Sequence, residues 1–226
     1  TAEDNLSALQ LIYYLKRHDI ITEELERAEE RYPDNVEILS FLGFVFGEMG
    51  SYDRAIETFE DALTVVDSDK KRSTLWGYIG DMYDMMGKAT KSYKAYDKAL
   101  KFNPDNESVL NNYAYHLSLI DKNLDKALEM SERAIKLDAG NYTFIDTYAW
   151  VLHRLGRNEE AKQHLRHALS LCSQRDADIL AHYGDVLWAL GEEFMADTYW
   201  KKAVEQGFDA KEMETHRALK HKEKRP

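Results

Sequence analysis

Two histidines and a glutamate come closest to a metal-binding set in this sequence. His164 and His167 are three residues apart, and Glu160 precedes them by one helical turn, so the three side chains would share one face of a helix. Imidazole nitrogens and carboxylate oxygens are ligands that zinc accepts. The zinc-type set is incomplete, however, and two solvated histidines on an outer helix face are the favoured interpretation. A metal-assisted hydrolase is therefore only the third functional hypothesis, and no metal or cofactor is predicted.

Other residue types that could do chemistry lack the partners that such chemistry needs. Cys172 has Arg175 nearby but no His–Asn pattern around it, which favours a small apolar packing role over a nucleophile. His153, Asp146 and Asp185 could form an acid–base cluster, but groove carboxylates more often contact a partner. The sequence has no glycine-rich phosphate loop, nucleophile elbow or dinucleotide fingerprint. We predict no catalytic residue and no enzymatic activity.

The composition describes a soluble chain with an acidic surface. Of 226 residues, 44% are hydrophobic and 31% are charged, which is typical of a globular or solenoid protein. Asp and Glu number 41 against 30 Lys and Arg, giving a formal charge of −11. This charge opposes binding to nucleic acid and favours basic or neutral partners. No apolar run approaches the roughly 18 residues of a membrane span, so direct membrane insertion is not expected.

The clearest pattern in the chain lies between Trp76 and Pro104. Large and small residues alternate there at helical spacing through two amphipathic segments, which predicts a helix–turn–helix unit. The pattern consists of Trp76, Ile79, Gly80, Tyr83, Gly87, Ser92, Tyr96, Ala99 and Pro104. It resembles the signature of the tetratricopeptide repeat, with Ile in place of Leu, Ser in place of Ala and Tyr in place of Phe.

Looser copies of this pattern cover almost the whole sequence. The predicted repeats span about residues 2–35, 36–71, 73–106, 107–141, 142–175 and 177–209. Seven of the eleven glycines fall at two repeat positions, either between the helices of a pair or in the turn that joins them. The resemblance implies an all-α fold, a right-handed superhelical solenoid of about six helix–turn–helix units, with a solenoid domain over residues 1–209.

Two irregularities and a distinct tail accompany the repeats. The polar stretch Asp67–Arg72 is predicted to be a connector that carries about three extra residues, and the unit over residues 107–141 lacks the glycine of its turn and has one residue inserted. Residues 210–226 are predicted to form a capping helix, bearing Met213, Ala218 and Leu219, and a basic tail. A basic docking tail is the alternative to a solvated cap.

The resemblance implies that the first helix of each pair lines a concave groove, whose outward positions would bind a partner. The candidate residues are Tyr14, Phe44, Asp81, Asp84, Asn111, Tyr115, Asp146, Trp150, Arg154, Asp185 and Trp188. Aromatic rings alternating with carboxylates suit an extended peptide or protein segment with apolar and basic side chains. The alternative is that Trp150 and Trp188 pack against the adjacent repeat.

The sequence therefore predicts a non-catalytic protein-interaction scaffold, with a self-associating module, and so a homo-oligomer, as the alternative. The positions at which carboxylate-gripping repeats carry their first lysine hold no basic residue here, which disfavours that subtype. Residues 111–115, 146–152 and 182–188 also resemble the C-terminal part of bacterial cell-envelope tetratricopeptide lipoproteins. This likeness implies a periplasmic or envelope-associated location, with the cytoplasm as the alternative.

Overall fold

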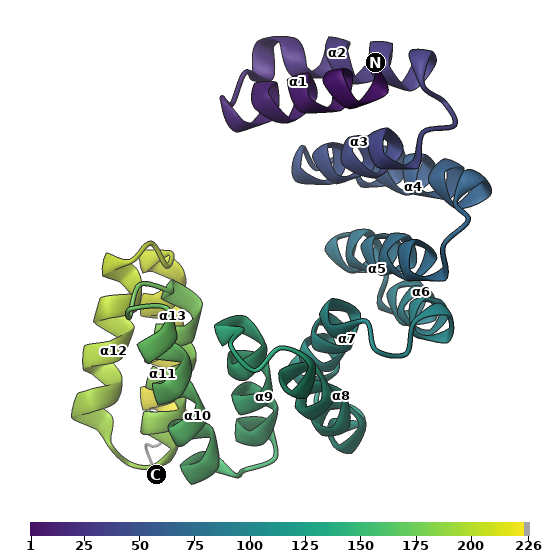
Figure 1. The fold of residues 1–226 in the computed structure, drawn as a ribbon. Helices are drawn as coiled ribbons and strands as arrows, with labels where there is room; N and C mark the ends of the chain where they lie inside the picture. Colours follow the sequence, from purple (N-terminus) through teal and green to yellow (C-terminus); the bar gives the residue numbers. More distant parts are fainter. Residues whose placement is uncertain (224–226) are drawn as a thin grey trace. The chain divides into compact units, whose positions relative to one another are not determined.

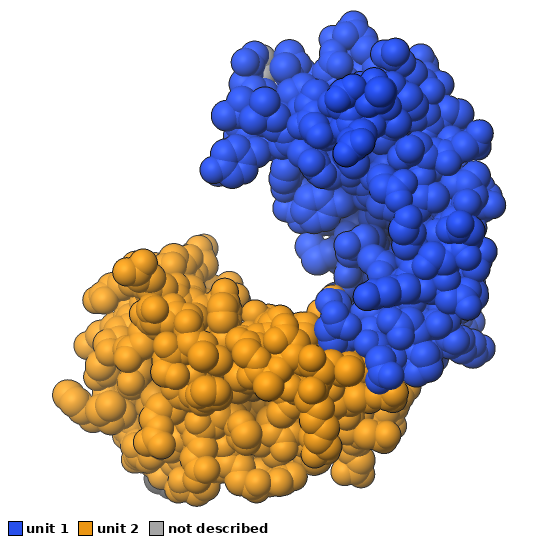
Figure 2. Space-filling view, viewed as in Figure 1, with its two compact units in different colours: residues 1–109 blue, residues 110–226 orange. Residues whose placement is uncertain are grey.

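A computed structural model describes residues 1–223, apart from the side chains of residues 18–19, 219 and 221–223. The described residues form thirteen α-helices joined by short connections and contain no strand (Figure 1). The all-α fold class predicted from the repeat pattern is confirmed. None of these helices is long and apolar enough to cross a membrane. The chain divides into two compact units, residues 1–109 and residues 110–226 (Figure 2).

Unit 1 contains three helix pairs and the first residues of α7. In each pair the first and second helices pack together, and each pair packs on the next. The helices are α1 (Ala2–Tyr14), α2 (His18–Arg31), α3 (Val36–Glu48), α4 (Tyr52–Val65), α5 (Asp69–Met85), α6 (Ala89–Phe102) and α7 (Glu107–Leu119).

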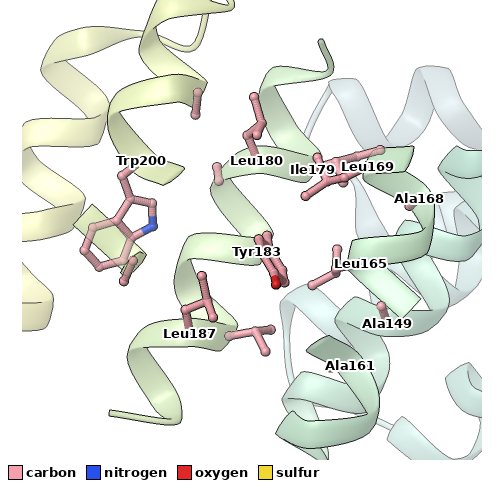
Figure 3. Packing of buried hydrophobic residues seen from close by; sticks show 14 of the residues in the cluster. Ala149, Ala161, Leu165, Ala168, Leu169, Ile179, Leu180, Tyr183, Leu187 and Trp200 are labelled. Atoms are coloured by element: carbon pink, nitrogen blue, oxygen red, sulfur yellow. The ribbon is translucent and has the colours of Figure 1, made fainter. Parts of the chain in front are cut away.

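Unit 2 contains the remainder of α7 and the six helices that follow it. Its helices are α8 (Leu124–Leu137), α9 (Tyr142–Arg154), α10 (Asn158–Leu171), α11 (Ala177–Ala189), α12 (Glu193–Glu205) and α13 (Ala210–Glu223). The second helices are amphipathic. In α8, for example, the buried residues recur at spacings of three and four and so lie on one face: Ala127, Met130, Ser131 and Ala134. Figure 3 shows the core that α9 to α12 form, in which Tyr183 of α11 and Leu165 of α10 belong to one cluster.

Glycines in the first helices let aromatic rings of the second helices approach the backbone. A Cβ atom at Gly43 would lie 2.5 Å from a ring carbon of Phe59, and one at Gly80 would lie 2.5 Å from a ring carbon of Tyr96. Gly184 is in equally close contact with Trp200. Since packed Cβ atoms do not approach this closely, the spacing of glycine and aromatic residues fixes how the helices of each pair cross.

The turn between α7 and α8 replaces the glycine of the other turns with two polar residues. Gly50, Gly87, Gly156 and Gly191 adopt positive φ angles in their turns, whereas here Asp121 and Asn123 do so, with φ of 51° and 50°. Asp and Asn tolerate this left-handed conformation better than most residues. The inserted residue predicted for this unit is accommodated in that turn.

The extra residues predicted before the third pair form helix rather than a connector. The helix α5 begins at Asp69 and has 17 residues, whereas α3 has 13. Ser68 is its N-cap, and the Arg72 guanidinium donates a 2.6 Å hydrogen bond to the carbonyl of Val66, which ties the new turn back to the preceding chain. The prediction of a polar connector over Asp67–Arg72 is therefore wrong from Asp69 onward.

The last helix, α13, attaches to unit 2 through one apolar and two polar contacts. Met213 is buried in the core of the unit, whereas Ala218 is exposed. His216 donates a 2.6 Å hydrogen bond to Asp185, and Arg217 donates two to Asp197. The side chain of Leu219 and residues 224–226, the end of the predicted basic tail, lie outside the described residues.

Candidate functional site

A cavity of about 260 Å³ lies on unit 2, where the first helices of three successive pairs supply its walls. The helices are α7, α9 and α11, joined by the residue that caps α11. The lining residues are Asn111, Asn112, Tyr115, His116, Thr143, Asp146, Thr147, Asp176, Asp178, Ile179 and His182. Three predicted groove residues, Asn111, Tyr115 and Asp146, therefore line one cavity.

An ion pair between α9 and α11 forms part of the cavity wall. The Nδ1 of His182 lies 3.0 Å from both carboxylate oxygens of Asp146, and both side chains are largely buried. Burial alone would lower the pKa of His182, but the charge and hydrogen bond of Asp146, with smaller contributions from Asp185 and Asp178, raise it above its ordinary value. Asp146 was predicted to bind a cationic group of the partner, but its carboxylate is already paired with His182 of its own chain.

Trp150 stacks on the same histidine. The ring centroids of Trp150 and His182 are 4.2 Å apart with an interplanar angle of 23°, and the ring of Tyr115 lies 6.4 Å from that of His182. Trp150 is only 8% exposed, yet its Nε1 has no hydrogen-bond partner among the described residues. Trp150 therefore packs as a core residue, as the alternative held, but it keeps an unused donor.

Asn111 lines the cavity and has an unused acceptor. It is 5% exposed, and its Nδ2 donates a 3.2 Å hydrogen bond to Oδ1 of Asn112. Its own Oδ1 is buried and has no hydrogen-bond partner in the described part of the chain. A buried acceptor in this state costs about 1–3 kcal/mol of stability. A donor from a ligand in the cavity would remove that cost.

Two further carboxylates lie at the α11 edge of the cavity. Asp176 caps α11 by accepting a 3.1 Å hydrogen bond from the backbone N–H of Ile179, and Asp178 is exposed in the first turn. Both are stabilised by the partial positive charge of the helix N-terminus. Among the described residues that line the cavity, none is Lys or Arg. Apart from the phenol of Tyr115, the ionisable side chains of the lining are therefore three carboxylates and two imidazoles.

Arg154, another predicted groove residue, is engaged by its own chain. Its Nε donates a 2.8 Å hydrogen bond to Oδ1 of Asp121 and its NH2 group contacts Oδ2, which gives a two-pronged ion pair. This pair lowers the pKa of Asp121. Arg154 thus fastens α9 to the turn between α7 and α8.

Asp185 and Trp188 are buried, although both were predicted to face outward. The carboxylate of Asp185 accepts a 3.0 Å hydrogen bond from Trp200 Nε1 as well as the one from His216. Trp188 is 5% exposed and its ring lies 5.6 Å from that of Trp200. Both residues support the packing of α12 and α13 on α11, because their partners come from those helices.

The predicted groove residues of unit 1 have separate surroundings. Tyr14 is 80% exposed at the end of α1, and Phe44 packs edge-on against Tyr13 at 5.8 Å. Asp81 accepts a 2.6 Å hydrogen bond from the hydroxyl of Tyr96. Asp84 lies half-buried one turn further along α5.

The residues considered for metal binding or nucleophilic chemistry have structural contacts. His164 packs edge-on against Tyr148 at 4.9 Å, and burial lowers its pKa, while Arg157 holds Glu160 through two hydrogen bonds of 2.7 Å. Cys172 packs against the core of unit 2. Over residues 1–223, no group of three or more His, Cys, Asp or Glu side chains is placed to hold a metal ion.

His182 is the central residue of the site that sequence reasoning missed. It follows Asp178 by four residues and precedes Asp185 by three, so helical spacing puts the three on one face of α11. That spacing could have identified it. His116, Asn112 and Asp176 were missed as well, and nothing in the repeat signature distinguishes them.

Comparison with known families identifies the repeats. Residues 36–65, 74–106 and 146–175 match the family model of the tetratricopeptide repeat. The chain therefore contains tetratricopeptide repeats. The first match coincides with α3 and α4, and the third begins within α9 and ends after α10. A search of curated proteins finds no match.

Solved structures share this tetratricopeptide repeat fold. PilF from Pseudomonas aeruginosa is 18% identical, with 79% of each chain covered and a TM-score of 0.66. PilW, a widely conserved type IV pilus biogenesis factor, is 20% identical over 76% of this chain and 77% of its own, with a TM-score of 0.67. YrrB, a tetratricopeptide repeat protein with an unusual peptide-binding site, is 17% identical over 86% and 97%, with a TM-score of 0.59. At these identities the likeness establishes the fold alone.

Proposed function

We propose that this protein is a non-catalytic interaction scaffold, and that the cavity of α7, α9 and α11 binds an extended segment of a partner protein. The observation that carries the proposal is the unused acceptor of Asn111. A buried oxygen without a partner is matched by an N–H donor of the bound segment, whether from its backbone or from a side chain. Binding of this kind needs no cofactor.

The neighbouring rings support the same proposal. Tyr115 and His182 line the same cavity as Asn111, and the ring of Trp150 stacks on His182 and supports it. Aromatic side chains are enriched where binding energy concentrates, because they bury a large area at little entropic cost. A side chain of the partner could pack on Tyr115 while an N–H group of the partner bonds to Asn111.

Charge indicates which partners are favoured. The cavity carries Asp176 and Asp178 in addition to the neutralising His182–Asp146 pair, and the whole chain has a formal charge of −11. A segment with basic side chains is attracted to such a surface, whereas an acidic one is repelled. The fold it shares with PilW, a pilus biogenesis factor, supports the periplasmic or envelope-associated location that we propose.

A selection from a displayed peptide library on the full chain, followed by fluorescence anisotropy, tests the proposal. Asn111→Ala should weaken the selected peptide about tenfold, the effect of one hydrogen bond, with little change in stability. Asn5→Ala is the matched control, because Asn5 on α1 of unit 1 also has a buried oxygen without a partner. Equal affinity for the wild type and Asn111→Ala would contradict the proposal.

Self-association is a second candidate, favoured by the exposed apolar residues of α1. Leu11 and Tyr14 on its last turn and Leu15, its C-cap, are all more than half exposed. Apolar side chains grouped in this way often mark an interface. Sedimentation over a range of concentrations should show a dimer that Tyr14→Glu abolishes; a monomer at every concentration would exclude this role.

A further inference from the structure

Three residues that line the cavity on unit 2 offer acceptors to a ligand. Asn111 contributes its unpartnered Oδ1 from α7, and Asp176 and Asp178 contribute carboxylates from the start of α11. Asp146 also faces the cavity, but its two oxygens already share the Nδ1 proton of His182. What a ligand must bring is therefore a group with several donors.

The carboxylates of the cavity favour cationic donors. The His182–Asp146 pair neutralises itself when the histidine is protonated, and Asp176 and Asp178 remain as negative charges. None of the described residues lining the cavity is a lysine or an arginine that could compensate them. A cation from outside would be attracted by both carboxylates at once.

The placement of the acceptors favours arginine over lysine as the source of the cation. The acceptors come from α7 and from the N-terminal end of α11, and Tyr115 also lines the cavity. A guanidinium group has five N–H donors in a rigid plane, so it can bond to acceptors on several sides and stack on an aromatic ring. A lysine ammonium is a compact and strongly hydrated charge that gains less from such a site.

Building on the proposed function, we propose that this cavity accepts the guanidinium group of an arginine side chain of the partner. Asn111 Oδ1 accepts a hydrogen bond from one edge of the guanidinium. Asp178, which is exposed, and Asp176 accept hydrogen bonds from the other edge. Tyr115 stacks on its plane.

The test uses capped amino acids, so that it does not depend on finding the partner. Nα-acetyl-arginine N-methylamide is titrated into the full chain, and the side-chain amide signals of Asn111 and Asn112 are followed by NMR. The lysine and citrulline analogues are titrated in parallel, because citrulline keeps the shape of arginine but lacks its charge. A fragment of this size should bind at about 1 mM or weaker.

We expect the arginine probe to shift these signals and to bind at least about threefold more tightly than the lysine probe, with no binding of citrulline. Asp178→Asn should weaken it about threefold or more, and Asn111→Ala about tenfold. Glu3→Gln is the control, since Glu3 is also an exposed acid in the first turn of a first helix.

Three results would overturn the arginine site: no shift of the Asn111 and Asn112 signals, equal affinity for arginine and citrulline, or equal losses in Asp178→Asn and Glu3→Gln. None of these would overturn the proposed function if library peptides without arginine still required Asn111. Conversely, arginine binding that persists in Asn111→Ala would place the cation elsewhere.

Discussion

The hydroxyl of Tyr96 donates a 2.6 Å hydrogen bond to Oδ1 of Asp81, fifteen residues earlier in the chain. In unit 2, Trp200 Nε1 donates to Asp185 across the same separation. In the pair of α3 and α4 the corresponding residues are Phe59 and Phe44, which have neither donor nor acceptor. In these three helix pairs, the residue after the glycine is therefore matched to the ring that covers that glycine.

A double-mutant cycle should measure the contribution of the Tyr96–Asp81 hydrogen bond to the free energy of unfolding. Tyr96 is fully buried, and burial together with the Asp81 carboxylate raises the pKa of its hydroxyl, which stays protonated. Asp81→Ala should cost about 1–3 kcal/mol of unfolding free energy, because it leaves that donor without an acceptor. Adding Tyr96→Phe should recover most of the loss, as the natural Phe44–Phe59 combination suggests. Additive losses in denaturant unfolding would show that the bond contributes nothing.

Gly80→Ala should destabilise unit 1 although it adds a single methyl group. The new Cβ would lie 2.5 Å from the ring of Tyr96, so the helices must move apart at a cost of about 1–3 kcal/mol. Gly140→Ala is the control, since its nearest neighbour would lie at 3.9 Å. Melting temperatures of the two variants should differ clearly, and equal values would mean that the α5–α6 crossing is wrongly placed.

Trp150→Phe should separate packing from binding. Because Trp150 Nε1 has no partner, losing it should cost less than about 1.5 kcal/mol of stability while the ring continues to pack. Trp200→Phe provides the comparison and should cost at least about 1 kcal/mol more, since it removes the donor to the buried Asp185. Loss of peptide affinity in Trp150→Phe alone would assign its N–H to the partner; equal stability losses would contradict the burial of an unused donor.

The His182–Asp146 pair predicts a pH dependence of stability. The pKa of His182 is raised in the folded protein, so the pair contributes fully below the ordinary histidine pKa of about 6.5, and its contribution is lost as the pH rises through the raised value. The difference in unfolding free energy between the wild type and His182→Gln should therefore shrink as the pH increases from about 5 to 9.

The wild type must be compared with His182→Gln, because a nearby histidine, His153, also makes stability depend on pH. Burial lowers the pKa of His153, which therefore contributes stability above the ordinary pKa and loses it as the pH falls. The two trends oppose each other in the wild type, but the effect of His153 cancels in the difference. A difference that grows with rising pH would refute the charged pair.

The spacing of glycine and aromatic residues was enough to predict the helix pairs. Gly80 and Tyr96 are repeat positions, and a close backbone approach needs only a missing side chain on one helix and a ring on the other. The start of α5 was not predictable in the same way. The segment Asp67–Arg72 is polar, which is typical of a connector. It is helical from Asp69 because Ser68 caps the helix and Arg72 bonds to the carbonyl of Val66.

The sequence predicted a site residue correctly only where the position of that residue on its own helix determines which way its side chain points. Asn111, Tyr115 and Asp146 were expected on the binding face and do line the cavity, although their role there remains a proposal. Asp185 and Trp188 share that face, but their contacts come from α12 and α13. Spacing within one helix carries no information about a neighbour that arrives 15 or 31 residues later.

The matched residue pairs limit how such repeats can be recombined. A crossover in the turn between α5 and α6 that brought in the helices of another repeat would set Asp81 against Phe59, or Phe44 against Tyr96. Either product loses a partner for a buried polar group, although each helix is native and the sequence keeps its repeat signature. A crossover between pairs keeps Asp81 with Tyr96. Exchange by whole helix pairs should therefore give folded chimaeras more often than exchange by single helices, and consensus engineering of this chain should vary the two positions together.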